Sequence, residues 1–274
     1  MGRLAGWIIK HQVIAFLVFA FAISWCLWIP DMIVTRGKMS LLIYAGAFGP
    51  FLSAVLVVWI AEKRVGLRQW FRTTFRLRIN IVWYLLGALL LPIGVLLLQF
   101  GLYLLWGGQP DFSEALPWWL YPLNLPIVML FAGGNEEPGW RGFALPRLLA
   151  KRNPLSASLI LGTIWAAWHV PLFFNAEWGG AGTPFVWFLA NVVGLSFIMT
   201  WLYHRSSGSV FPVMLFHQAT NSIWSYFPMP DDVLSGIDDF IVFKTIVYWT
   251  IAIVLITATK GRLGYHLETP SLEA

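Results

Sequence analysis

The chain has 274 residues, of which 58% are hydrophobic and only 11% carry a charged side chain, and its mean hydropathy is +0.71. A soluble globular domain has about 45–50% apolar and about 25% charged residues, so this composition excludes an ordinary soluble domain and indicates a polytopic membrane protein. The net charge of +5 fits the Lys and Arg excess that orients membrane proteins, and we predict no nucleic-acid partner. The single Cys26 excludes a multi-cysteine metal cluster.

The apolar segments predict an all-α membrane helix bundle. A membrane-spanning helix needs about 20 mostly apolar residues, and the sequence predicts about eight of them by this criterion. In chain order they cover 12–30, 40–61, 81–106, 120–147, 155–174, 184–203, 210–227 and 240–259. The sequence has no internal repeat and no soluble segment of domain size, so we predict one membrane-embedded domain over residues 1–274.

The loops between these segments alternate in positive charge. The connection 62–80 carries six Lys and Arg residues, whereas "GGQPDFSEALPW" and "FPMPDDVLSGIDD" carry none. Only Arg36 and Lys38 break the alternation. Because Lys and Arg accumulate in cytoplasmic loops, both termini are predicted to be cytoplasmic. The 62–80 loop also contains aromatic residues, so it is either an interfacial helix on anionic lipid or a simple orienting loop.

A small set of polar residues lies within the predicted spans, where ionisable side chains are costly and indicate function. At about 1.5 Å of rise per residue, an acid, two histidines and an amide from three spans lie at a similar depth, roughly 18–26 Å from the basic loops. Lys244, near the outer start of the last span, is expected to snorkel. The polar set consists of Glu136, Glu137, Arg141, His169, His217, Asn221 and Lys244.

The spacing of the acids assigns them different tasks. Glu137 and Arg141 are four residues apart and can pair on one helix, which relieves the cost of burying both charges. Glu136 then stays free for chemistry. Pro138 disfavours a helical Glu137, so the helix breaks or begins again there. Irregular backbone at membrane depth is tolerated against protein or a water-filled cavity.

The two later polar motifs are expected to face the same cavity. His217 and Asn221 are four residues apart and share one helix face, and Trp165, one turn before His169, is expected to form a wall. We therefore predict that Glu136, His169, His217 and Asn221 line one cavity.

Three motifs within about residues 130–225 resemble a known family. "EEPGWRG", "WAAWH" and "HQATN" are similar to the EExxxR, aromatic-xxx-His and HxxxN/D motifs of the CAAX prenyl protease and bacteriocin-processing (CPBP, Abi) intramembrane proteases. The chain departs from the family pattern at Pro138 and at Trp165, where phenylalanine is commoner. Neither departure removes a proposed catalytic group. The matching residues are Glu136, Glu137, Arg141, Trp165, His169, His217 and Asn221.

The resemblance implies a multi-pass integral membrane endopeptidase, in the cell membrane if the source is bacterial, that acts on peptide or protein substrates at the lipid bilayer. Two mechanisms stay open. In one, Glu136 and His169 activate water, while His217 and Asn221 donate hydrogen bonds to the oxyanion. In the other, Glu136, His169 and His217 ligate zinc, and this His₂Glu ligand set favours the metal slightly.

Other functions and substrates are compatible with the same residues. A transporter or proton relay also uses Glu and His at mid-membrane depth, but the chain has no inverted repeat and no second acid–base cluster. A non-catalytic scaffold or immunity protein would keep the cavity for binding alone, without a reason to retain every proposed catalytic side chain. The substrate class stays open between prenylated CAAX peptides and bacteriocin leaders or other hydrophobic peptides.

Overall fold

The computed structural model describes residues 2–36, 38, 40–113, 115–175, 177–178, 183–227, 229, 233–234 and 239–265. All regular secondary structure in these residues is helical, which confirms the predicted all-α class. Within the described ranges, six helical segments are long and apolar enough to cross a membrane. They are Gln12–Thr35, Leu41–Thr74, Ile81–Leu105, Pro154–Phe174, Phe185–Arg205 and Phe240–Ala258.

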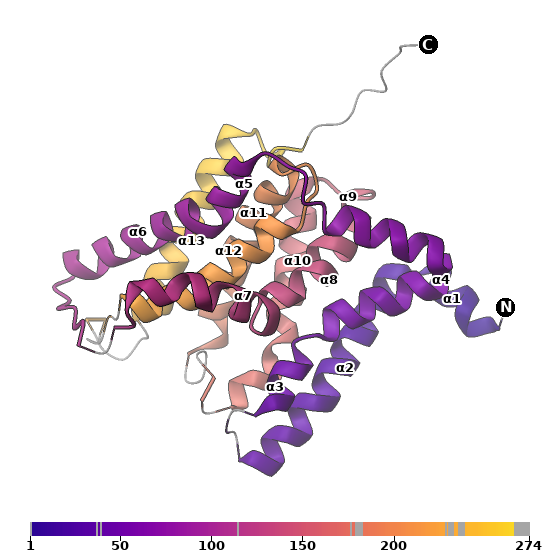
Figure 1. Ribbon diagram of the computed structural model, residues 1–274, viewed down its shortest axis with the longest axis horizontal. Coiled ribbons are helices and arrows are strands. Elements are labelled where there is room, and N and C mark those ends of the chain that lie inside the picture. The colour runs from indigo at the N-terminus through magenta and orange to yellow at the C-terminus, as the bar shows by residue number, and fades with distance from the viewer. Residues whose placement is uncertain are drawn as a thin grey trace, which may run out of the picture.

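The N-terminal third forms a helical unit at one side of the molecule (Figure 1). Its helices are α1 (Arg3–Lys10), α2 (Gln12–Thr35), α3 (Leu41–Gly46) and α4 (Gly49–Thr74). Two buried side chains of α2 donate hydrogen bonds to backbone carbonyls of α3. Trp28 Nε1 donates to the Ile43 carbonyl over 2.8 Å, and Ser24 Oγ donates to the Gly46 carbonyl over 2.7 Å. In a lipid environment such internal hydrogen bonds replace those that water would supply.

The next span is continuous although it contains a proline. Asn80 caps its start by accepting a hydrogen bond from the Val82 amide. The helix α5 (Ile81–Leu85) continues through a π-helical turn (Leu86–Leu90) into α6 (Leu91–Leu105). Pro92 has no amide hydrogen for the Ala88 carbonyl, and the Tyr121 hydroxyl donates to that carbonyl over 2.7 Å instead.

Two of the eight predicted spans are interrupted helices. The segment 120–147 begins with α7 (Tyr121–Phe131) and leaves the helix at Ala132, and 210–227 forms α12 (Phe211–Ser222) followed by a 3₁₀ turn. Helices of 11 and 12 residues are about 16–18 Å long, well below a 30 Å hydrocarbon core. The segment 120–147 thus contains a helix break, as Pro138 predicted, although the break lies earlier in the chain. Among the described residues, six helices rather than about eight meet the criteria of length and apolarity.

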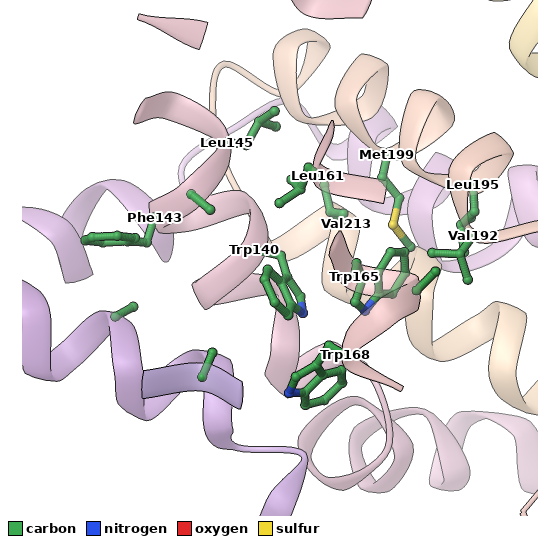
Figure 2. Close-up of a cluster of buried hydrophobic side chains, with 14 of the residues drawn as sticks. Trp140, Phe143, Leu145, Leu161, Trp165, Trp168, Val192, Leu195, Met199 and Val213 are labelled. Atoms are coloured by element: carbon green, nitrogen blue, oxygen red, sulfur yellow. The ribbon is translucent and has the colours of Figure 1, made fainter. Parts of the chain in front are cut away.

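The C-terminal half supplies most of the buried core. The helices α10 (Pro154–Trp168), α11 (Phe185–Arg205) and α13 (Asp239–Ala258) pack in series, and α12 contacts α7 and α11. Figure 2 shows the core, in which the indole rings of Trp140, Trp165 and Trp168 lie near one another and Val192, Leu195 and Met199 close one side. All three indoles are buried, and those of Trp165 and Trp168 contact the ring of His169.

Candidate active site

The backbone around the acid pair is irregular. After α7, Gly133 adopts φ +125°, and the chain continues as a 3₁₀ turn (Gly134–Glu136), the short helix α8 (Glu137–Gly139) and a π-helical turn (Trp140–Ala144) before α9 (Leu145–Leu149). Pro138 lies in the first turn of α8, where a missing amide hydrogen is tolerated. The predicted new helix start is present, and the break itself lies earlier, at Ala132 and Gly133.

Glu137 is the centre of a buried ionic cluster. Its carboxylate accepts a hydrogen bond from Arg141 Nη1 over 3.0 Å, and a second N–O pair of the same residues is 2.9 Å apart. Both side chains are 0% exposed. The same carboxylate lies 2.7 Å from Nδ1 of His217. The structure therefore contains the predicted Glu137–Arg141 pair and adds His217 from α12 to it.

Glu136 points to a different helix. Its Oε2 accepts a hydrogen bond from the indole N–H of Trp165 over 2.7 Å. The backbone carbonyl of Trp165 lies 2.8 Å from Nδ1 of His169, and the Arg141 guanidinium lies over the Trp165 ring at 4.2 Å. Trp165, expected only as a wall, thus links three motif residues. A buried indole N–H needs a hydrogen-bond acceptor. A tryptophan within a predicted span is therefore the sequence feature that indicates such a contact.

His169 and His217 are both hydrogen-bonded within the protein through Nδ1, which leaves Nε2 of each ring for the reaction. A carbonyl or a carboxylate oxygen only accepts hydrogen bonds, so Nδ1 of His169 and Nδ1 of His217 each carry a proton. In the neutral form, Nε2 of each ring then holds a lone pair that is able to accept a proton. The ring of His169 is enclosed by Trp168, Trp178 and Phe188, which holds its orientation.

Asn221 connects α12 to the helix break after α7 by a hydrogen bond. Its Nδ2 donates to the Ala132 carbonyl over 3.0 Å, and its backbone carbonyl accepts a hydrogen bond from Trp224 Nε1 over 2.7 Å. Unlike Glu136, His169 and His217, which are buried, Asn221 is exposed. Three of the four predicted residues therefore lie in the protein interior and the fourth at its surface. The predicted shared cavity stays a prediction.

Two further polar residues lie near the motifs, and Asn135 is the one that was not predicted from the sequence. Asn135 is buried, and its Oδ1 accepts a hydrogen bond from the Gly133 amide over 3.1 Å, a local turn bond typical of Asn. Lys244 of α13 is half-buried, and its Nζ donates to the Thr220 carbonyl over 3.0 Å, one residue before Asn221. This carbonyl belongs to the last turn of α12, which offers free carbonyls to a cation. The expectation that Lys244 snorkels stays a prediction.

The zinc hypothesis requires three ligands that lie close together. Glu136, His169 and His217 each have one atom free for a metal, and histidine ligands held through Nδ1 are common in metal sites. Among the described residues, however, no three His, Cys, Asp or Glu side chains lie close enough together to hold a metal ion. In this conformation the three side chains do not form a ready zinc site.

Gly133→Ala is expected to lower turnover at least tenfold. A Cβ atom on Gly133 would lie 2.6 Å from Asn221 Nδ2 and 2.8 Å from His217 Nε2, so both side chains would have to move, and a left-handed φ adds about 1–2 kcal/mol of strain. The matched control is Gly94→Ala, where an added Cβ meets nothing within 4 Å. Initial rates and unfolding curves of both variants check this. Equal activity of the two would contradict it.

The region that matches a known protein family contains all three motifs. A family model described as type II CAAX prenyl endopeptidase Rce1-like matches residues 117–223. The chain is also 23% identical over 266 residues to a protein named CAAX prenyl protease 2 from Methanococcus maripaludis, with 92% of this chain and 95% of that protein covered. Together with the six apolar helices, the motifs and both matches identify the chain as a multi-pass integral membrane protein that resembles the type II CAAX prenyl endopeptidases.

Proposed function

We propose that the protein is an intramembrane endopeptidase in which Glu136 and His169 activate the water that attacks a peptide bond. The observation that supports this most directly is the buried chain from Glu136 through Trp165 to His169, with bonds of 2.7 and 2.8 Å. The chain holds a carboxylate and an imidazole in fixed orientations. The family matches favour this function over a transporter or a non-catalytic scaffold.

In this mechanism one proton moves from the attacking water to Glu136 and from there to the leaving amine. Glu136 uses one oxygen for the Trp165 N–H and the other to take a proton from water as the new C–O bond forms. Nε2 of His169 is the second acceptor near the same water. Glu136 then returns its proton to the leaving amine as the C–N bond breaks, the usual exchange of general base and general acid.

Asn221 and His217 are proposed to stabilise the oxyanion. The second amide hydrogen of Asn221 is left for substrate after the first binds Ala132. His217 donates from Nε2 only when its ring is doubly protonated, and Glu137, 2.7 Å from Nδ1, is the carboxylate that would stabilise that cation. Arg141 in turn holds Glu137 in place.

The substrate is proposed to be a peptide or protein segment at the membrane. An isoprenylated CAAX peptide is the first one to assay, because the relative from Methanococcus maripaludis is named a CAAX prenyl protease. A hydrophobic peptide without the lipid is its control. The excess of Lys and Arg in the loop 62–80 supports the proposal that this side, with both termini, faces the cytoplasm.

Asn221→Ala tests the proposed oxyanion site. In reconstituted vesicles we expect a fluorogenic peptide to be cleaved by the wild type and about 10²-fold more slowly by the variant, with the change in kcat and little in KM, because the donor acts on the transition state. Asn124→Ala is the control, since it removes an amide that binds the Tyr226 hydroxyl outside the motifs. An unchanged kcat for Asn221→Ala would contradict the assignment.

Metal removal separates the two mechanisms. The zinc alternative is supported by the free Nε2 atoms of two buried histidines and needs Zn–N distances of about 2.0–2.1 Å. If zinc is required, chelation abolishes cleavage, and His169→Ala loses metal and activity together, while Asn221→Ala keeps the metal. Metal content by mass spectrometry, measured beside the cleavage rate, decides. Full cleavage by metal-free protein would rule out the zinc scheme.

A further inference from the structure

The second half of α4 is a separate helix. Lys63 adopts φ 56° and ψ −151°, which is not helical, and this residue divides α4 into two arms. Figure 1 shows the bend, after which the second arm runs back across the molecule towards α5. We refer to residues 64–74 as the basic helix. A helix that turns at such a kink has left the direction of the membrane-spanning arm.

The two faces of the basic helix differ completely. Gly66, Trp70 and Thr74, four residues apart, are buried against the protein. Two positions earlier in each turn, and thus on the opposite face, the sequence places an exposed row of three arginines. They are Arg64, Arg68 and Arg72.

The arginine row has no anionic partner among the described residues. Across the part of the chain that the structure describes, no carboxylate forms an ion pair with Arg64, Arg68 or Arg72. Like charges four residues apart on a helix repel each other and destabilise it. A row of three cations without an acid therefore carries a repulsion that an external anion would relieve.

Apolar side chains are exposed beside the arginines. Val65 is 78% exposed and Phe71 is 37% exposed. Arginines with exposed apolar residues between them are typical of helices that lie at the boundary between lipid headgroups and acyl chains. The combination fits a lipid surface better than a soluble anion, which has no use for the apolar contacts.

We infer that Arg64, Arg68 and Arg72 form a docking surface for anionic phospholipid headgroups, with Val65 and Phe71 in the adjoining acyl region. Each basic residue near an anionic membrane surface contributes about 1 kcal/mol. Three arginines then correspond to a preference for anionic over zwitterionic lipid of up to about 10²-fold.

The buried face connects this surface to the catalytic motif, an extension that rests on the proposed function. Trp70 Nε1 donates to the Gly142 carbonyl over 3.0 Å. Thr74 packs so closely on Gly142 that a Cβ there would lie 2.8 Å from its methyl group. Gly142 follows Arg141 in the π-helical turn. Lipid bound to the arginine row therefore holds the basic helix against the segment that carries the Glu137–Arg141 pair.

Lipid binding is measured on the purified full-length protein, independently of any cleavage. Native mass spectrometry in detergent with equal amounts of phosphatidylglycerol and phosphatidylcholine gives the preference of the wild type. The test variant is Arg64→Gln/Arg68→Gln/Arg72→Gln. The control is Lys151→Gln/Arg152→Gln/Arg262→Gln, which removes the same charge from other exposed positions. A third variant, Arg64→Lys/Arg68→Lys/Arg72→Lys, keeps the charge.

We expect the wild type, the control and the Lys variant to prefer phosphatidylglycerol, and the Gln variant to lose most of that preference. Equal preference in the wild type and the Gln variant, or equal loss in the control, would overturn the inference. Displacement of phosphatidylglycerol by an equal concentration of inorganic phosphate would also overturn it, because the site would then bind free anion.

Cleavage in vesicles provides the second readout. We expect the wild type to be several-fold faster in phosphatidylglycerol than in phosphatidylcholine, and the Gln variant to show no such difference. If the lipid preference is present but no variant cleaves peptide in either lipid, the proposed function fails and the docking surface stands. If cleavage occurs without any lipid preference, the docking surface fails and the protease stands.

Discussion

Glu136→Gln is expected to reduce kcat for peptide cleavage by about 10⁴, at the upper end of what general acid–base catalysis contributes. The amide has nearly the shape of the carboxylate, and its oxygen still accepts the hydrogen bond from Trp165 Nε1 that Glu136 accepts over 2.7 Å. It cannot take a proton from water. Initial rates of a fluorogenic peptide in reconstituted vesicles give the effect.

A matched carboxylate distinguishes loss of chemistry from loss of charge. Glu62 is 45% exposed and pairs with Arg147 at 3.4 Å, away from the motifs, so Glu62→Gln should keep nearly the wild-type rate. The unfolding midpoint of Glu136→Gln should stay near that of the wild type, because its packing is unchanged. If Glu136→Gln cleaves as fast as Glu62→Gln, the assignment of Glu136 as the base is wrong.

Glu137→Ala is expected to lower the free energy of unfolding by about 3–5 kcal/mol, the effect of leaving a buried charge without its partner. The Glu137 and Arg141 side chains are both 0% exposed, and Nδ1 of His217 would lose its acceptor as well. Denaturant titration in detergent, followed by tryptophan fluorescence, measures the change. Activity should fall with it, because His217 would no longer be oriented.

The exposed pair again serves as the control. Glu62→Ala breaks an ion pair whose side chains are 26% and 45% exposed, and such surface pairs contribute about 0–1 kcal/mol. Replacing both members of the buried pair, as Glu137→Ala/Arg141→Met, should recover part of the lost stability but not the activity. A Glu137→Ala variant as stable as Glu62→Ala would show that the buried cluster is not a structural requirement.

Local spacing along the chain determined a large part of the site. The composition identified a membrane protein, and the four-residue spacing of Glu137 and Arg141 was enough to predict their ion pair, which the structure contains. The start of α8 at Glu137 also follows from local rules, because Pro138 is tolerated only in a first turn. Each of these predictions depends on residues less than two turns apart, where backbone geometry fixes the distance.

Contacts between distant segments were decided by the tertiary structure alone. The Trp165–Glu136 and His217–Glu137 bonds join residues 29 and 80 positions apart, and no helical periodicity fixes such a distance. Lys244 of α13 donates to the Thr220 carbonyl of α12, which is a contact between residues 24 positions apart. Hydropathy likewise reports which residues avoid water but not whether their helix is continuous. The break at Ala132 and Gly133 lies in an apolar segment. Asn135 binds the Gly133 amide locally, whereas the Ala132 carbonyl is bound by Asn221 of α12, a residue 89 positions away in the chain.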